Sequence, residues 1–166
     1  MIAGDDSPTF DIYPSSVAPY VPTPQSAVER ALELAEIGPK DYVLDLGCGD
    51  GRAVITAAVK VGSRGLGVEL DPVLVGHCRR LAHDRGVARL VEFRCGDIFE
   101  VDLPPASVVF LFLRAGTPSQ LRTRLERQLI PGTRVAVYKY EVEGWTPIRV
   151  EQIDDRYAEP IRLYRM

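Results

Sequence analysis

Three glycines alternate at positions 47, 49 and 51, directly after the mostly apolar segment 43–46. Glycine lacks a Cβ atom, so its backbone adopts angles that other residues avoid and can approach a bound ligand closely. A glycine-rich turn between a strand and a helix is typical of the floor of a nucleotide-binding site. We therefore predict that Gly47, Gly49 and Gly51 lie beneath a nucleotide-like cofactor.

The spacing of these glycines argues against a nicotinamide dinucleotide. Sites for that cofactor use Gly-x-Gly-x-x-Gly or Ala, and the third position of this pattern, counted from Gly47, is Arg52. A side chain of that size would obstruct the close packing of the helix on the strand. Asp45 would also be poorly placed beside a pyrophosphate, whereas it suits the ammonium group of an amino-acid-like ligand, directly or through water.

Two further acidic residues lie at the end of, or just after, later strand-like segments. Glu69 lies where a carboxylate can accept hydrogen bonds from both hydroxyls of a ribose, and we expect Leu70 to contact the cofactor beside it. Asp97 can accept from an adenine amino group while the backbone of Ile98 contacts the ring. Each short motif alone also occurs as a simple turn or helix cap. Together, an amino-acid end, a ribose end and a base end in this order describe S-adenosylmethionine.

The apolar pattern predicts the elements that position these residues. Strand-like and helix-like segments alternate, and apolar runs such as 108–113 are typical of parallel strands covered on both faces. Right-handed crossovers then favour a doubly wound, Rossmann-like α/β sheet of seven strands, mostly parallel. A short connection predicts an antiparallel C-terminal hairpin at one sheet edge. The expected strands are 42–46, 64–70, 90–95, 107–113, 133–140, 146–153 and 159–166.

Four helices are expected around this sheet. The first should have Thr23 as its N-cap and Pro24 at its first position, and should stop at Gly38. The second, 52–61, should turn Val59 and its apolar neighbours toward the core. The third is capped by Asp71, and the fourth opens at residue 117.

Composition narrows the class of protein. The 166 residues carry a net charge of −3, and we expect a mobile arm over residues 1–12 and one domain over residues 13–166. The mild acidic excess gives no support to a nucleic-acid partner, and three widely spaced cysteines favour neither disulfides nor a metal site. No apolar run approaches ~18 residues, and the first residues do not resemble a signal peptide. These features predict a cytoplasmic monomer or weak oligomer without a membrane segment.

From about residue 40 to its end, the chain resembles the class I, seven-strand S-adenosylmethionine-dependent methyltransferases, most specifically over residues 43–52. A narrower likeness rests on segments 20–24, 96–103, 130–135 and 144–147. Through this set the chain is similar to the small archaeal protein-lysine methyltransferases and their membrane-anchored mitochondrial relatives. The resemblance implies a protein-lysine N-methyltransferase with a protein substrate. It also implies that Tyr20 and Thr23 contact the methionine end of the cofactor.

Two segments depart from this narrower family, and both lie on the expected acceptor side. Many relatives have a small residue and a histidine near the end of the fifth strand, where this chain has Tyr138-Lys139-Tyr140; segment 113–117 departs from a Leu-Pro-containing form. A lysine acceptor must lose a proton to react, and aromatic walls can hold its charged and methylated forms. We identify no general base, and we expect such walls from Phe112, Tyr138, Tyr140 and Trp145.

Other functions stay open at this point. The altered acceptor segments, and the lack of an added substrate domain, are compatible with a methyltransferase for a small molecule or RNA. A non-catalytic partner that keeps the fold is disfavoured by the intact glycines and acidic residues. A nicotinamide oxidoreductase is disfavoured by the glycine spacing.

Overall fold

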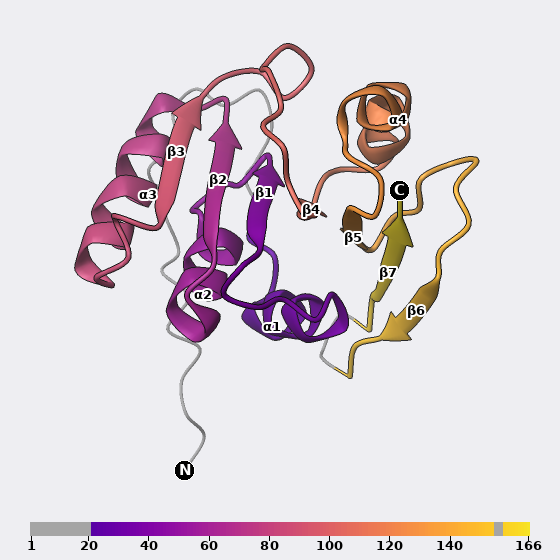
Figure 1. Cartoon of the computed structure of the whole chain (residues 1–166), viewed down its shortest axis with the longest axis horizontal. Helices are drawn as coiled ribbons and strands as arrows, with labels where there is room; N and C mark the ends of the chain where they lie inside the picture. The colour runs from indigo at the N-terminus through magenta and orange to yellow at the C-terminus, as the bar shows by residue number, and fades with distance from the viewer. Residues whose placement is uncertain (1–20, 155–157) are drawn as a thin grey trace.

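The computed structural model describes residues 21–154 and 158–166 (Figure 1). The expected mobile arm, residues 1–12, lies outside the described residues, as does Tyr20. The elements follow one another as α1 (Gln25–Leu34), β1 (Tyr42–Leu46), α2 (Arg52–Val61), β2 (Arg64–Glu69), α3 (Pro72–Asp84), β3 (Val91–Cys95), β4 (Val108–Leu111), α4 (Thr117–Gln128), β5 (Arg134–Tyr138), β6 (Arg149–Gln152) and β7 (Pro160–Arg165).

One seven-stranded sheet forms the centre of the fold, in the order β3-β2-β1-β4-β5-β7-β6. The first five of these strands pair in parallel, whereas β7 is antiparallel to both β5 and β6. This confirms the predicted Rossmann-like fold and its antiparallel C-terminal hairpin. Because the parallel strands run in one direction, the segments that follow β1, β2, β3, β4 and β5 all lie at one edge of the sheet, here called the carboxyl edge.

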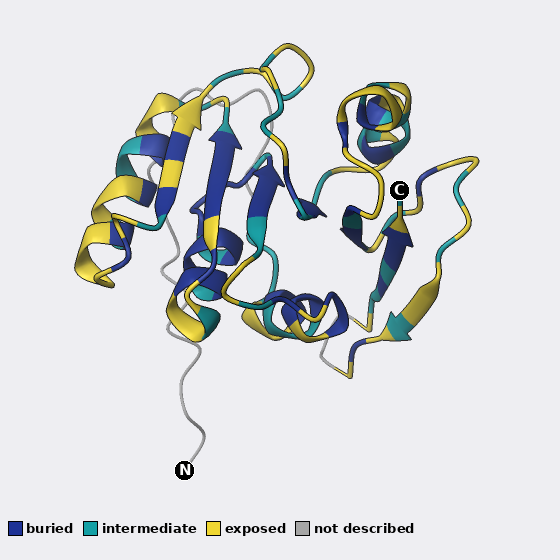
Figure 2. Cartoon of the chain, in the orientation of Figure 1, coloured by how far each residue is buried: buried dark blue, intermediate teal, exposed yellow. Residues whose placement is uncertain are grey.

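Helices cover the sheet on both faces (Figure 1). Most of the buried residues of α1, α2 and α3 belong to one apolar cluster, here called the α1-side cluster. Leu121 and Leu125 of α4 belong to a second cluster on the opposite face, here called the α4-side cluster. The inner strands β1, β2, β4 and β5 are mostly buried, whereas the outermost strands β3 and β6 and the outer sides of the helices are largely exposed (Figure 2). Among residues 21–154 and 158–166, every helix is too short or too polar to span a bilayer.

The start of α1 differs from the prediction. Pro24, and not Thr23, holds the N-cap position, and no side chain caps the helix. The carbonyl oxygen of Pro24 accepts the first helical hydrogen bond from the amide of Val28, at 3.1 Å. Thr23 was therefore wrong as an N-cap, and its carbonyl oxygen has a different partner, described below.

The end of α1 also differs, because the helix stops at Leu34 and not at Gly38. Glu36 adopts the left-handed conformation with φ 50°, a conformation that favours glycine. The amide of Ile37 then donates to the carbonyl oxygen of Leu32 at 3.2 Å, which satisfies the end of the helix. Nothing in the pattern of side chains signals this stop, since glutamate is an ordinary helix residue.

The strands β4 and β5 end sooner than predicted. Phe112 and Leu113 therefore lie in the loop after β4, and Lys139 and Tyr140 lie in the loop after β5. These four residues line the carboxyl edge and are not part of the sheet. The bounds of α2 were predicted correctly. Val59 was expected to face the core, but it is 52% exposed, so that prediction was wrong.

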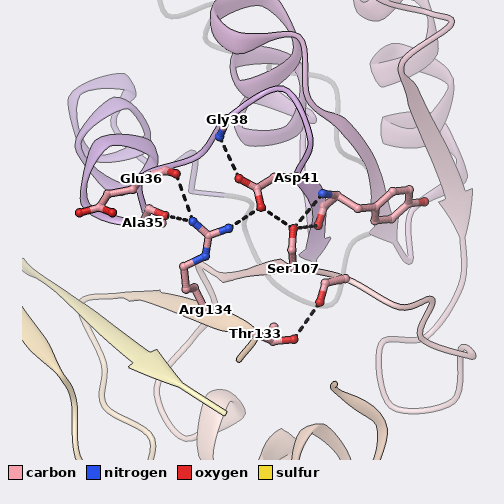
Figure 3. A network of polar contacts seen from close by, with 9 residues as sticks. Ala35, Glu36, Gly38, Asp41, Ser107, Thr133 and Arg134 are labelled. Atoms are coloured by element: carbon pink, nitrogen blue, oxygen red, sulfur yellow. Dashed lines mark hydrogen bonds and ion pairs between the residues drawn. The ribbon is translucent and has the colours of Figure 1, made fainter. Parts of the chain in front are cut away.

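The opposite edge of the sheet is fastened by a polar network (Figure 3). The Arg134 guanidinium donates to the Asp41 carboxylate and to the carbonyl oxygens of Ala35 and Glu36. Asp41 also accepts from the Gly38 amide at 2.8 Å and from the Ser107 hydroxyl at 2.7 Å. The network connects the end of α1 to the beginnings of β1, β4 and β5.

This network changes the pKa of Asp41. Burial acts to raise it, but the hydrogen bonds from Gly38 and Ser107 and the charge of Arg134 outweigh burial, so the pKa of Asp41 is lowered. Replacing the carboxylate by a neutral amide removes the ion pair while preserving the size of the side chain. Asp41 is therefore the residue through which the contribution of the network can be measured.

We expect Asp41→Asn to lower the free energy of unfolding by about 2 kcal/mol at neutral pH, because charge-assisted hydrogen bonds are lost. A lowered folded pKa means that this stability is present above the unfolded pKa of ~3.9 and is lost as the pH falls through the folded value. Urea unfolding of both proteins, at neutral pH and at about pH 3, should show the difference shrinking in acid. Asp84→Asn is the control, since that side chain is 73% exposed. An equally large difference at both pH values would contradict this account.

Candidate functional site

The glycine turn after β1 is fixed to the end of β2 by backbone hydrogen bonds. The amides of Gly47 and Cys48 both donate to the carbonyl oxygen of Val68 at 2.9 Å. Gly47, Gly49 and Gly51 have φ of 78°, 55° and 78°, in the left-handed region that other residues rarely adopt. The predicted turn is therefore present, and its backbone faces the carboxyl edge.

Packing beneath the turn imposes a second requirement for glycine. A Cβ atom on Gly51 would lie 2.7 Å from the ring of Phe93, and one on Gly67 of β2 would lie 2.7 Å from the sulfur of Cys48. A Cβ atom on Gly47 would lie 2.5 Å from the side chain of Leu113. These glycines are thus needed for close packing within the protein.

Two thiols pack beneath the turn. Cys48 and Cys78 are buried free cysteines, and the Cys78 thiol donates to the carbonyl oxygen of Gly49 at 3.2 Å. The hydrogen bond with Cys78, together with burial, raises the pKa of Cys48 well above its usual value. The Cys48 thiol therefore remains neutral, and both side chains support the turn by packing.

Glu69 joins the turn to the end of β2. One carboxylate oxygen accepts from the Gly49 amide at 2.9 Å, and the other accepts from the amides of Leu70 and Asp71 at 2.8 and 3.1 Å. A carboxylate has about four acceptor positions, so these bonds leave room for about one more donor. For Glu69 to accept two hydrogen bonds from a ribose, as predicted, one backbone amide must be released, or one carboxylate oxygen must accept from an additional donor.

Asp45 lies in the centre of the site and is 3% exposed. It lies in β1 between Gly67 of β2 and Phe110 of β4, and its Oδ1 has no hydrogen-bond partner among the described residues. Burial, and after it the negative charges of Glu69 and Asp50, raise the pKa of Asp45 to about 8. The Asp45 carboxyl group is therefore mostly protonated at neutral pH. A buried polar atom without a partner is unusual in a folded protein and requires a physical explanation.

The third strand end bears Asp97 and Ile98. The Asp97 carboxylate accepts from the Phe99 amide at 2.8 Å, which is a local turn contact. Ile98 is partly buried against the α4-side cluster, and its carbonyl oxygen accepts from Arg124 at 2.7 Å. Leu70 and Phe99 are 68% and 44% exposed, so two large apolar side chains remain accessible at this end of the site. Such exposure suits an aromatic ring of a ligand.

Arg52 is a site residue that sequence reasoning missed. Its guanidinium binds the Asp50 carboxylate, and its Nη1 donates to the carbonyl oxygen of Thr23 at 2.7 Å. This contact holds segment 21–24 against the first residue of α2, next to the glycine turn. The signal was present as Asp-Gly-Arg at positions 50–52, but the partner of Arg52 lies in a distant segment.

The acceptor-side aromatic residues divide into two groups. Phe112 stacks on Phe110 at 5.2 Å between ring centroids and meets the ring of Tyr138 edge-on at 6.0 Å, on the α1-side cluster. Tyr140 follows in the loop after β5, and the Lys139 ammonium lies over its ring. Phe112 and Tyr140 thus follow the neighbouring strands β4 and β5, and Tyr138 is the last residue of β5.

Trp145 is not brought together with the other three. It packs on Tyr164 at 5.5 Å in the α4-side cluster, and its indole N–H donates to Glu126 at 2.7 Å. A cavity of about 220 Å³ lies beside it, lined by Glu126, Gly144, Trp145, Thr146, Tyr164, Arg165 and Met166. Because it lies on the opposite face from Phe112 and Tyr138, Trp145 is separated from the acceptor side.

The known proteins that this chain resembles are methyltransferases. The family model described as the ANTKMT methyltransferase domain matches residues 45–149. A protein-lysine N-methyltransferase from Saccharolobus islandicus is 40% identical over 82% of this chain and 86% of that protein. An adenine nucleotide translocase lysine N-methyltransferase from Mus musculus is 35% identical over 80% of this chain, but the match spans only 57% of the mouse protein.

A solved structure is also similar. It is described as an RNA methyltransferase from Salinibacter ruber in complex with S-adenosyl-L-homocysteine. The two chains are 44% identical with a TM-score of 0.83, over 87% of this chain and 93% of the other. The curated relatives and this structure therefore agree on the type of domain, while the acceptors in their descriptions differ.

We expect Asp45→Asn to raise the free energy of unfolding of the ligand-free protein at neutral pH. The folded protein holds a proton on Asp45 that the unfolded chain, with a pKa of ~3.9, has released. Wild-type stability should therefore fall, relative to the variant, as the pH rises from about 4 to about 8. Thermal unfolding across this pH range measures the effect, with the exposed Asp102→Asn as control. A variant that is less stable than wild type throughout would refute the assignment.

Proposed function

This chain belongs to the ANTKMT methyltransferase domain family, and we propose that it transfers the methyl group of S-adenosylmethionine to lysine side chains of proteins. The arrangement of acidic residues at the ends of β1, β2 and β3 carries the cofactor half of the proposal. The archaeal relative, matched over 86% of its length, supports the acceptor half.

The residues of the carboxyl edge fit this cofactor. The turn of Gly47, Gly49 and Gly51 would support its amino-acid end, with Tyr20 and Thr23 on the other side, and Glu69 would bind the ribose hydroxyls. At the far end, the adenine ring would meet Asp97 and Ile98, with Leu70 as an apolar contact. The unpartnered Oδ1 of Asp45 is the observation that favours a charged ligand here.

Asp45 has a specific part in this proposal. A protonated carboxyl group cannot balance a cation, but S-adenosylmethionine carries positive charge on its sulfonium and ammonium groups. A positive charge nearby favours the ionised carboxylate and lowers its pKa. We infer that Asp45 loses its proton when the cofactor binds and then serves as the buried counter-charge.

The chemistry places few demands on the protein. S-adenosylmethionine supplies an activated methyl group, so the main task of the chain is to align the acceptor and exclude water. Alignment of this kind contributes about 7–11 kcal/mol in well-oriented models. Phe112 and Tyr138 would exclude water, and desolvation would lower the pKa of an acceptor lysine so that its neutral amine can react.

RNA is the second candidate acceptor, because the similar Salinibacter ruber structure is described as an RNA methyltransferase. Nucleic-acid-binding domains usually carry a basic face, whereas this chain has a net charge of −3. We therefore favour protein. The cytoplasmic location, the monomeric or weakly associated state and the single domain over residues 13–166 remain predictions from the sequence.

Incubation of the chain with cell extract and methyl-labelled S-adenosylmethionine tests the acceptor. We expect label in proteins, at lysine by mass spectrometry, that survives ribonuclease and disappears after protease treatment. Excess S-adenosylhomocysteine, the product, should suppress it. Label confined to RNA or to small molecules would reject the lysine proposal while preserving the methyltransferase domain.

Glu69→Ala should weaken the binding of S-adenosylmethionine by about 2 kcal/mol, which is about 30-fold in Kd. Its carboxylate is the proposed partner of the ribose, and it also binds the Gly49 amide. Isothermal titration calorimetry measures the change, and Glu92→Ala, an exposed glutamate on β3, is the matched control. An unchanged Kd in a folded Glu69→Ala protein would remove Glu69 from the site.

A further inference from the structure

Residues 96–107, all of which the structure describes, connect β3 to β4 without a helix. In the sheet, β2 and β1 lie between these two strands, so the connection crosses both of them. Its side chains Ile98, Val101 and Leu103 pack on the α4-side cluster, which includes side chains of β1 and β2. A connection of this kind has no regular structure to pair its backbone carbonyl groups, which need other partners.

The first part of this connection is a tight turn at the carboxyl edge, residues 97–101. The carbonyl oxygen of Asp97 accepts from the amides of Glu100 and Val101, at 3.0 and 2.9 Å. Just before the turn, the amide of Gly96 donates to the carbonyl oxygen of Glu69 at 3.0 Å. The start of the turn is therefore fixed to the end of β2, beside the carboxylate proposed to bind ribose.

Arg124 of α4 holds the rest of the turn. Its Nη1 donates to the carbonyl oxygen of Ile98 at 2.7 Å, and its Nη2 donates to the carbonyl oxygen of Val101. One planar, forked guanidinium thus binds two carbonyl groups three residues apart, which a single ammonium group matches less well. Hydrogen bonds from a charged donor are stronger than those between neutral groups. Arg124 lies 26 and 23 positions from these partners, so the contact fastens the turn to a separate helix.

The turn held by Arg124 is the segment proposed to meet adenine through Asp97 and Ile98. Adenine differs from hypoxanthine at one position of the ring, where adenine has an amino group that donates and hypoxanthine has a carbonyl oxygen that accepts. A carboxylate distinguishes the two only when it is held at hydrogen-bond distance from that position, because hydrogen bonds weaken steeply with poor geometry. The discrimination therefore depends on where the turn is held relative to Glu69.

We propose that Arg124 is a positioning residue that sets the base specificity of the cofactor site, by holding the turn so that Asp97 meets the amino group of adenine. The inference rests on the proposed S-adenosylmethionine site. Arg124 acts through the backbone of Ile98 and Val101 and does not itself touch the cofactor. Without Arg124, the turn stays attached at Gly96 and through its apolar side chains. We therefore expect the fold to persist while the position of Asp97 is no longer fixed.

Arg122 of the same helix offers a matched control. Its Nη1 donates to the carbonyl oxygen of Glu143 at 2.9 Å, in the loop after β5, and its Nε donates to Glu126 at 3.0 Å. Arg122 and Arg124 thus both fasten a distant loop to α4 through a backbone carbonyl group, but Arg122 holds a different loop. A purely structural role for Arg124 predicts the same outcome for both arginines.

Isothermal titration calorimetry of the purified chain compares S-adenosylhomocysteine with S-inosylhomocysteine, which has a carbonyl oxygen in place of the adenine amino group. We expect wild type to bind the adenine form about tenfold more tightly or better, because Asp97 accepts from the amino group and repels the carbonyl oxygen. Arg124→Met should weaken the binding of the adenine form several-fold and that of the inosine form little, so that the preference is lost. Arg124→Lys should retain part of the preference, and Arg122→Met should retain all of it.

A double-mutant cycle separates this role from a general loss of structure. Asp97→Ala should abolish the preference, and Arg124→Met added to it should change the preference no further, because both substitutions act on one contact. A folded Arg124→Met protein that keeps the wild-type preference, or that binds both compounds more weakly by the same factor, would overturn the proposal. A wild type that binds both compounds equally would do the same.

The lysine variant decides the case in which Arg124→Met does not fold. A folded Arg124→Lys protein with a reduced preference supports the proposal, and one with the full preference overturns it. If wild type binds neither compound, the proposed cofactor site fails first, and that result is distinct from a changed preference.

Discussion

Three consecutive backbone amides fasten the glycine turn to the end of β2, and the site depends on them. Gly47 and Cys48 donate to the carbonyl oxygen of Val68, and Gly49 donates to the carboxylate of Glu69. The bonds require the backbone of the turn to lie close to β2. The side chains of Cys48, in the turn, and Phe93, in β3, then leave no room for a side chain on Gly67. They also place the glycine turn beside the carboxylate proposed to bind ribose. Glu69 therefore has both a structural and a proposed ligand-binding part.

The two edges of the sheet differ in how their charges are satisfied. At the edge where the parallel strands begin, opposite the carboxyl edge, Asp41 is paired with Arg134 and hydrogen-bonded to Ser107, and its pKa is lowered. At the carboxyl edge, Asp45 is buried with an unpartnered oxygen, and its pKa is raised to about 8. A protein accepts such a destabilising group where a ligand compensates for it. The fold is thus held firmly at one edge, and the other is the edge at which we propose that a charged cofactor binds.

The sequence predicted the parts of the fold that depend on local pattern. The bounds of α2, the strand Tyr42–Leu46 and the Asp71 cap of α3, which accepts from Val73, all agree with the structure. What it could not predict depends on contacts between distant segments. Arg52 reaches Thr23 across 29 positions, and Trp145 packs on the face opposite to Phe112. Likewise, nothing in the sequence shows that the Glu69 carboxylate already binds three amides.

A crystal structure of the chain with S-adenosylhomocysteine tests the central claim most directly. We expect the ribose hydroxyls within hydrogen-bond distance of the Glu69 carboxylate, the amino-acid end above Gly47, Gly49 and Gly51 near Asp45, and the adenine ring beside Asp97 and Ile98. An adenosyl group bound at another edge of the sheet, or a carboxyl edge filled by side chains so that no ligand enters, would contradict the account.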